Sequence, residues 1–194
     1  GTGDVLSLIR GDFREIAGVD GTREMLSCAL AHDSLEGVPL ASCRWEKLAS
    51  FFLATGKYVL IYFLGNSISH VDGPEEFEGI LATVFSDGLN PGGLLAFDLR
   101  GWEMCVKLGH LVQPGREVGV ARPLATIVCD RDRVDIAETC TYSERRQYIH
   151  YSVTRAGREE SYTLSYLMVT REEAERALSE AGFRLLVEPL PDTV

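Results

Sequence analysis

Hydrophobic positions along the first hundred residues alternate between two periods. Helical spacing, with an apolar residue at every third or fourth position, marks residues 5–9, 22–32 and 73–89. Continuous apolar runs, typical of parallel strands covered on both faces, are found in residues 14–20, 57–65 and 94–99. Alternating strands and helices with short connections predict an open parallel α/β sheet with helices on both faces.

The pattern changes near Glu117, where β-rich segments replace the alternation of strand and helix. An antiparallel meander is predicted from the segments 124–130, 133–142, 146–154 and 160–168. After it, Thr170 and Glu173 form a capping-box pattern, and Gly182 is placed to end a helix. Residues 183–190 then predict a closing strand. A chain of 194 residues is long enough for one domain of this kind.

Charge and cysteine content narrow the class of protein. A net charge of −10 argues against nucleic acid as a partner, because such binding depends on a basic surface. An apolar run of 18 residues and a signal peptide are both absent, so neither a membrane nor export is predicted. The five cysteines are scattered and lack the spacing of a metal site. We interpret them as reduced thiols of a cytoplasmic protein and predict no metal.

The first residues carry a candidate cofactor site. Gly1-Thr2-Gly3 stands directly before a predicted helix, whose start offers free N–H groups to a ligand that approaches the backbone closely. Asp20 ends the next predicted strand, where a carboxylate can accept hydrogen bonds from two ribose hydroxyls. Either feature alone is also typical of an ordinary turn or a helix N-cap. Together they predict a nucleoside-containing cofactor, but "GTGDVL" lacks the GxGxxG spacing expected for a nicotinamide.

Three further motifs carry a family resemblance. They are "DGTREML" at 20–26, "LGNS" followed by His70 at 64–70, and "LNPGG" at 89–93. With these motifs the chain resembles class I S-adenosylmethionine-dependent methyltransferases, and within them the glycine and sarcosine N-methyltransferases. The resemblance extends from Gly1 to about Trp102 and is only architectural beyond it. It implies a Rossmann-like sheet with the antiparallel β insertion after the fifth strand.

The resemblance also implies three parts and a set of site residues. The parts are a cofactor-binding α/β core (1–112), an antiparallel β insertion on the substrate side (113–169), and the final helix and strand (170–194). S-adenosylmethionine would be held by Gly1, Gly3, Asp20, Gly21, Met25, Arg44, Trp45 and Leu64, leaving S-adenosylhomocysteine as product. The substrate would be bound and oriented by Asn66, Arg100, Tyr166 and, as a weaker candidate, His70.

The chemistry of Asn66 and Arg100 supports this placement independently. Each follows a predicted buried strand, so both should reach the crevice at the carboxyl ends of the sheet. Arginine recognises planar carboxylates with two parallel hydrogen bonds, and asparagine adds a neutral donor. The structural alternatives are a surface ion pair for Arg100 and a turn for Asn66. For His70 a structural role in the loop is favoured over that of proton acceptor, and Tyr166 fits a packing role as well as a role in the site. Water or a nearby tyrosine, Tyr166, is the hypothesis for the group that takes a proton from the substrate amine.

The sequence departs from the family pattern in three places. A central strand and acidic residue should precede Gly1, so we expect a fragment, a partly ordered part of a longer protein, or a sheet completed by another segment. Arg44 stands where the family has Asp or Asn near the adenine amino group, and arginine cannot accept that hydrogen bond. Tyr58 replaces an aspartate at the start of a strand.

The prediction is therefore an S-adenosylmethionine-dependent N-methyltransferase that acts on the amine of a small carboxylate-bearing substrate such as glycine or sarcosine. The alternatives are a methyltransferase for another small amine or sugar, and a non-catalytic methyltransferase-like protein that binds cofactor or a partner chain. A nicotinamide oxidoreductase is the least favoured. Homo-oligomers are common in the family and are possible here.

Overall fold

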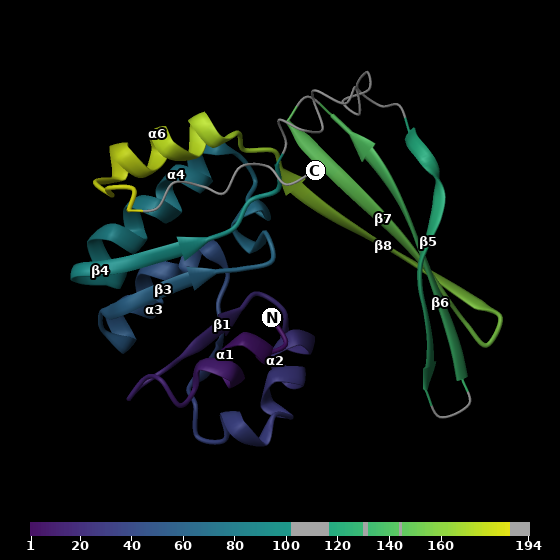
Figure 1. The fold of residues 1–194 in the computed structure, drawn as a ribbon, viewed down its shortest axis with the longest axis horizontal. Coiled ribbons are helices and arrows are strands. Elements are labelled where there is room, and N and C mark those ends of the chain that lie inside the picture. The colour runs from purple at the N-terminus through teal and green to yellow at the C-terminus, as the bar shows by residue number, and fades with distance from the viewer. Residues whose placement is uncertain (102–116, 130–131, 144, 187–194) are drawn as a thin grey trace.

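The chain forms an α/β core from which four antiparallel strands extend (Figure 1). The computed structural model describes residues 1–101, 117–129, 132–143 and 145–186. The core helices and strands are α1 (Asp4–Ile9), β1 (Gly18–Asp20), α2 (Arg23–Leu30), β2 (Leu40–Ser42), α3 (Leu48–Thr55), β3 (Tyr58–Phe63), α4 (Pro74–Thr83), β4 (Leu89–Phe97) and α6 (Arg171–Ala181). Short 3-10 turns cover Asp33–Leu35, Trp45–Lys47 and Ser67–Ser69, and a π-helical turn covers Val84–Gly88.

The core strands pair in parallel, as predicted, but in two separate pairs. β1 pairs with β2 and β3 pairs with β4. Figure 1 shows α4 and α6 on one side of the β3–β4 pair and α3 on the other. Residues 90–93, predicted as a turn, lie within the bounds of β4 but have no partner in β3, because the pairing steps from Tyr58–Leu89 to Leu60–Leu94. Gly92 in this bulge has a left-handed φ of 78°. The predicted strand at 14–20 is shorter than expected and covers only Gly18–Asp20.

A cleft of about 710 Å³ lies between the two pairs. Ile16 and Ala17 line it on the side of β1, and Tyr58, Val59 and Leu60 line it on the side of β3. Among the described residues, β1 and β3 each have a strand partner on one edge only. The expectation that the 57–65 strand is covered on both faces is wrong at Val59, which is 61% exposed.

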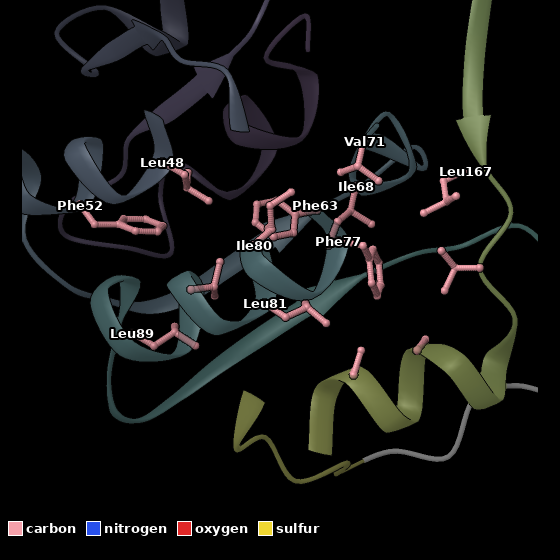
Figure 2. Close-up of a cluster of buried hydrophobic side chains, with 14 residues drawn as sticks. Leu48, Phe52, Phe63, Ile68, Val71, Phe77, Ile80, Leu81, Leu89 and Leu167 are labelled. Atoms are coloured by element: carbon pink, nitrogen blue, oxygen red, sulfur yellow. The ribbon is translucent and has the colours of Figure 1, made fainter. Parts of the chain in front are cut away.

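A hydrophobic core joins α3, α4 and α6 to the β3–β4 pair (Figure 2). Phe77, Ile80 and Leu81 of α4 are buried in it, which confirms the helical stripe read from the sequence. Leu167 at the end of β8 (Arg158–Leu167) is buried in the same cluster. The antiparallel sheet is thus anchored at one end in the core that supports the parallel strands.

The predicted meander is confirmed as a four-stranded antiparallel sheet in the order β5-β6-β7-β8. Its other strands are β5 (Glu117–Cys129), β6 (Asp132–Tyr142) and β7 (Arg146–Arg155). The predicted closing strand is wrong for residues 183–186, which have no regular structure, and its remaining residues lie outside the described part of the chain. Phe183 instead packs edge-on against Phe85, with ring centroids 5.1 Å apart. Within the described residues, none of the helices is long and apolar enough to cross a membrane.

The capping box of α6 is the most local of the confirmed predictions. The Thr170 hydroxyl accepts a hydrogen bond from the Glu173 backbone, and the Glu173 carboxylate accepts one from the Thr170 backbone. Gly182 adopts the left-handed conformation, with φ 101°, at the other end.

Thr170→Ala should lower the free energy of unfolding by about 1 kcal/mol, because it leaves an amide at the start of α6 without its acceptor. Urea unfolding would measure the change. Ser179→Ala, at an exposed position of the same helix, is the matched control and should change stability little. Equal losses in the two variants would contradict the capping role.

Candidate functional site

The glycine turn before α1 is tightly packed. Gly3 has φ 88°, and a Cβ atom added to it would lie 2.8 Å from Leu35 Cδ1 and 2.9 Å from Ala29 Cβ. Only glycine fits this position without strain. Gly3 is also the N-cap of α1, and no side-chain cap is found there among the described residues. The first backbone N–H groups of this short helix are compatible with the predicted cofactor loop, which stays a prediction.

Asp20 lies at the carboxyl end of β1 with its carboxylate fixed in place. Its Oδ1 accepts hydrogen bonds from the Thr22 amide at 2.7 Å and the Thr22 hydroxyl at 2.6 Å. Its Oδ2 accepts one from the Gly1 amino group. Partial burial alone would raise the pKa of Asp20, but these donors lower it below its ordinary value. Asp20 is thus an ionised acceptor at the carboxyl end of β1.

The structure brings Arg44 and Gly21 to the same corner as Asp20. The parallel register places Asp20 opposite Ser42, and the Cys43 amide donates to the Asp20 carbonyl at 2.9 Å. A Cβ atom on Gly21 would lie 3.7 Å from Arg44 Cγ. The side chain of Arg44 therefore lies beside the loop that follows Asp20, although arginine offers only donors there.

The remaining cofactor candidates lie on three elements. Met25 on α2 is 43% exposed, and Leu64, just after β3, is 45% exposed. Both are large apolar side chains left open to solvent, which is compatible with ligand contact. Trp45 packs edge-on against Phe63, with ring centroids 5.3 Å apart, so part of its surface serves the core. The described hydrogen-bond partners of the Asp20 carboxylate are Gly1 and Thr22, so it is bonded to none of these three side chains.

Asn66 occupies a left-handed position, with φ 58°, in the loop after β3. Its backbone N–H faces the Asp98 carboxylate, with N–O distances of 3.2 and 3.3 Å. Asp98 follows β4, so this contact joins the ends of two neighbouring strands. The side-chain oxygen of Asn66 is buried and has no hydrogen-bond donor in the part of the chain that the structure describes.

The structure brings three of the substrate candidates into one cluster. The rings of His70 and Tyr166 lie 4.3 Å apart between centroids, and Arg100 Cζ lies 5.0 Å from the centroid of the Tyr166 ring. His70 Nδ1 lies 3.0 Å from the Ser165 carbonyl. Because a carbonyl only accepts, Nδ1 carries the proton of the neutral ring, and Nε2 keeps its lone pair. Asn66, by contrast, has no described contact with this cluster.

The environment of His70 keeps its imidazole neutral at pH 7. Loss of surrounding water lowers the pKa of His70 below its ordinary value, the hydrogen bond to Ser165 opposes this, and the charge of Arg100 adds to it. The negative charge of Asp20 opposes this lowering of the His70 pKa.

The sequence analysis missed two residues that hold Arg100 and His70 in place. Gln147 on β7 is 4% exposed and accepts a hydrogen bond from Arg100 Nη1 at 2.8 Å. Arg146 donates to the Val71 carbonyl and to the Ser165 hydroxyl, both at 2.7 Å. The sequence does contain a signal for Gln147. It is a polar residue two and four positions before Ile149 and Tyr151, so on a strand it shares their face.

Comparison with known proteins identifies the fold. The sequence matches no family model and no curated protein. Among solved structures, it matches an S-adenosylmethionine-dependent methyltransferase from Clostridium acetobutylicum ATCC 824, with TM-score 0.71 and 18% identity over 93% of this chain and 69% of that chain. An amino pentose methyltransferase of calicheamicin biosynthesis from Micromonospora echinaspora, with S-adenosylmethionine bound, matches with TM-score 0.67 and 23% identity over 94% of this chain and 71% of that one.

A sugar N-methyltransferase from Streptoalloteichus sp. ATCC 53650 also matches, with TM-score 0.70 and 21% identity over 94% of this chain and 68% of that one. The chain has the class I methyltransferase fold. The fold class predicted from the sequence is thus confirmed. The narrower resemblance to glycine and sarcosine N-methyltransferases stays a prediction.

The neutral state of His70 has a measurable consequence. In an NMR pH titration its imidazole should titrate below pH 6.5. Because the unfolded chain then binds this proton first, the free energy of unfolding should fall as the pH drops through 6.5 toward the pKa of the folded state. His70→Gln should remove this part of the pH dependence. A titration midpoint at or above the ordinary value would contradict the assignment.

Proposed function

We propose that this chain transfers a methyl group from S-adenosylmethionine to the amine of a small carboxylate-bearing substrate such as glycine or sarcosine. The observation that carries the proposal is the state of Arg100. Its guanidinium contacts a neutral amide and an aromatic ring, and no carboxylate among the described residues pairs with it. A guanidinium held in this way is suited to bind a carboxylate from outside the chain.

The cofactor corner supports the same activity. When bound, S-adenosylmethionine supplies an electrophilic methyl group on sulfur. Asp20 offers an ionised oxygen to ribose hydroxyls, and the turn at Gly3 offers backbone amides. Met25 on α2 and Leu64 after β3 are exposed apolar side chains that would contact the cofactor. The donor and acceptor types fit a nucleoside cofactor, and Arg44 is the one residue whose chemistry does not match adenine recognition in the family.

On the substrate side, orientation and proton removal are the tasks of the chain. Arg100 would hold the carboxylate, so that the amine at the other end is directed toward the reacting methyl group. The amine must be neutral to attack, and His70 Nε2 is an unprotonated acceptor in the same cluster. This geometry favours His70 over the Tyr166 phenol as the proton acceptor. The buried Asn66 oxygen, which has no donor among the described residues, would accept a second substrate hydrogen.

A sugar amine is the second candidate substrate. Two of the matching structures are described as an amino pentose methyltransferase and a sugar N-methyltransferase. Sugars present hydroxyls rather than a carboxylate, and Arg100 would then have no anionic partner. The charge on Arg100 favours the carboxylate substrate over this alternative.

Methyl transfer to a panel of amines separates the two candidates. With glycine, sarcosine and glucosamine as acceptors, S-adenosylhomocysteine should form fastest with the two amino acids. Arg100→Gln should lower kcat/KM for glycine by about tenfold or more, because a charge-assisted hydrogen bond is lost, and should affect glucosamine far less. Turnover of glucosamine alone, or equal losses for both acceptors, would overturn the carboxylate substrate class.

A further inference from the structure

Gln147 is a buried polar residue whose side-chain amide is hydrogen-bonded through both its oxygen and its nitrogen. Its Oε1 accepts from Arg100 Nη1 at 2.8 Å, and its Nε2 donates to the Tyr142 hydroxyl at 2.9 Å. Because arginine only donates, the amide oxygen must face Arg100, and this fixes the orientation of the whole amide. The side chain is therefore held in one arrangement from both ends.

The sheet places this amide in a row with two tyrosines. Cross-strand pairing sets Gln147 of β7 directly opposite Tyr142 of β6 and opposite Tyr166 of β8. Directly opposed residues share one face of an antiparallel sheet. Arg100 contacts both the Gln147 amide and the Tyr166 ring, so the guanidinium is fixed from two directions. Neither of these two neighbours carries a negative charge.

The choice of an amide has an electrostatic consequence. Arginine at a buried polar contact is usually matched by a carboxylate, and glutamate has nearly the same shape as glutamine. A carboxylate at position 147 would position the guanidinium equally well but would cancel its charge at short range. The amide positions the guanidinium and leaves the charge available to a ligand.

We propose that Gln147 is a specificity-determining positioning residue, whose neutral amide fixes Arg100 and preserves its charge for a substrate carboxylate. The proposal rests on the proposed function, because it names what selects the substrate class at that site. Under this proposal β7 contributes to substrate recognition through the neutral charge of the Gln147 amide, and not only through its packing.

Two substitutions separate charge from packing. Gln147→Glu keeps an acceptor for Arg100 and adds a charge, whereas Gln147→Met keeps the size and removes both hydrogen bonds. If Gln147 has only a structural role, Gln147→Met should weaken carboxylate binding more than Gln147→Glu does. If the proposal holds, Gln147→Glu should weaken it more. Ser161→Glu, at an exposed position of β8 whose side chain lies on the opposite face from Tyr166, controls for added charge.

Calorimetric titration of each protein with glycine and with glycinamide, in the presence and absence of S-adenosylhomocysteine, gives the ratio of the two affinities. The wild type should prefer glycine. Gln147→Glu should reduce this preference by about tenfold or more, Gln147→Met by less, and Ser161→Glu hardly at all. Melting temperatures would show that the variants are folded.

The outcomes separate this proposal from the proposed function. Suppose that the wild type methylates glycine, but that the preference for glycine over glycinamide survives Gln147→Glu or falls more in Gln147→Met. This result would overturn the role of Gln147 and leave the proposed function standing. A preference for glycine that depends on the amide, in a protein that binds no S-adenosylhomocysteine, would support Gln147 and overturn methyl transfer. Equal affinity of the wild type for glycine and glycinamide would overturn the role of Gln147.

Discussion

The candidate site depends on how the start of β7 is fastened to the α/β core. Three consecutive side chains there each hold a different element. Arg145 forms an ion pair with Glu173 of α6 at 2.7 Å, Arg146 donates to the carbonyls of Val71 and Asp72, and Gln147 accepts from Arg100. Because β8 pairs with β7 along its length, these contacts also set the position of Tyr166 beside His70. The candidate substrate residues thus come together where the antiparallel sheet meets the loops after β3 and β4.

The parallel strands provide the other half of the constraint. Asp20 ends β1, Asn66 follows β3, and Arg100 follows β4, so all three lie toward the carboxyl ends of their strands. In open α/β folds this is where ligands bind. The cofactor and substrate candidates therefore come from the same end of the parallel strands.

Local features of the sequence predicted the structure well, and features that depend on distant partners did not. The capping box at Thr170 and the stripe on α4 need only neighbours within the same helix, and both are present. The strand expected at 183–190 was wrong over 183–186, because an apolar run shows β propensity but not whether a pairing edge is available.

The same limit applies to the site. Asn66 and Arg100 were placed at strand ends by the pattern of apolar runs, and the structure places them there. The contact between the rings of His70 and Tyr166 joins residues far apart in the chain, and it depends on where β8 lies beside the loop after β3, which the sequence pattern does not reveal. Gln147 was missed for this reason, since a lone polar residue in a strand shows its purpose only once its cross-strand neighbours are known.

Calorimetric titration of this chain with S-adenosylhomocysteine tests the central claim most directly. The account predicts saturable binding of one molecule per chain, weakened at least about tenfold in Asp20→Asn because a charged acceptor for the ribose is lost. Asp33→Asn, which removes the same charge at an exposed position, should leave the affinity unchanged. A folded protein that does not bind, or that binds equally well without the Asp20 carboxylate, would contradict the claim that this fold holds a methyl donor at the end of β1.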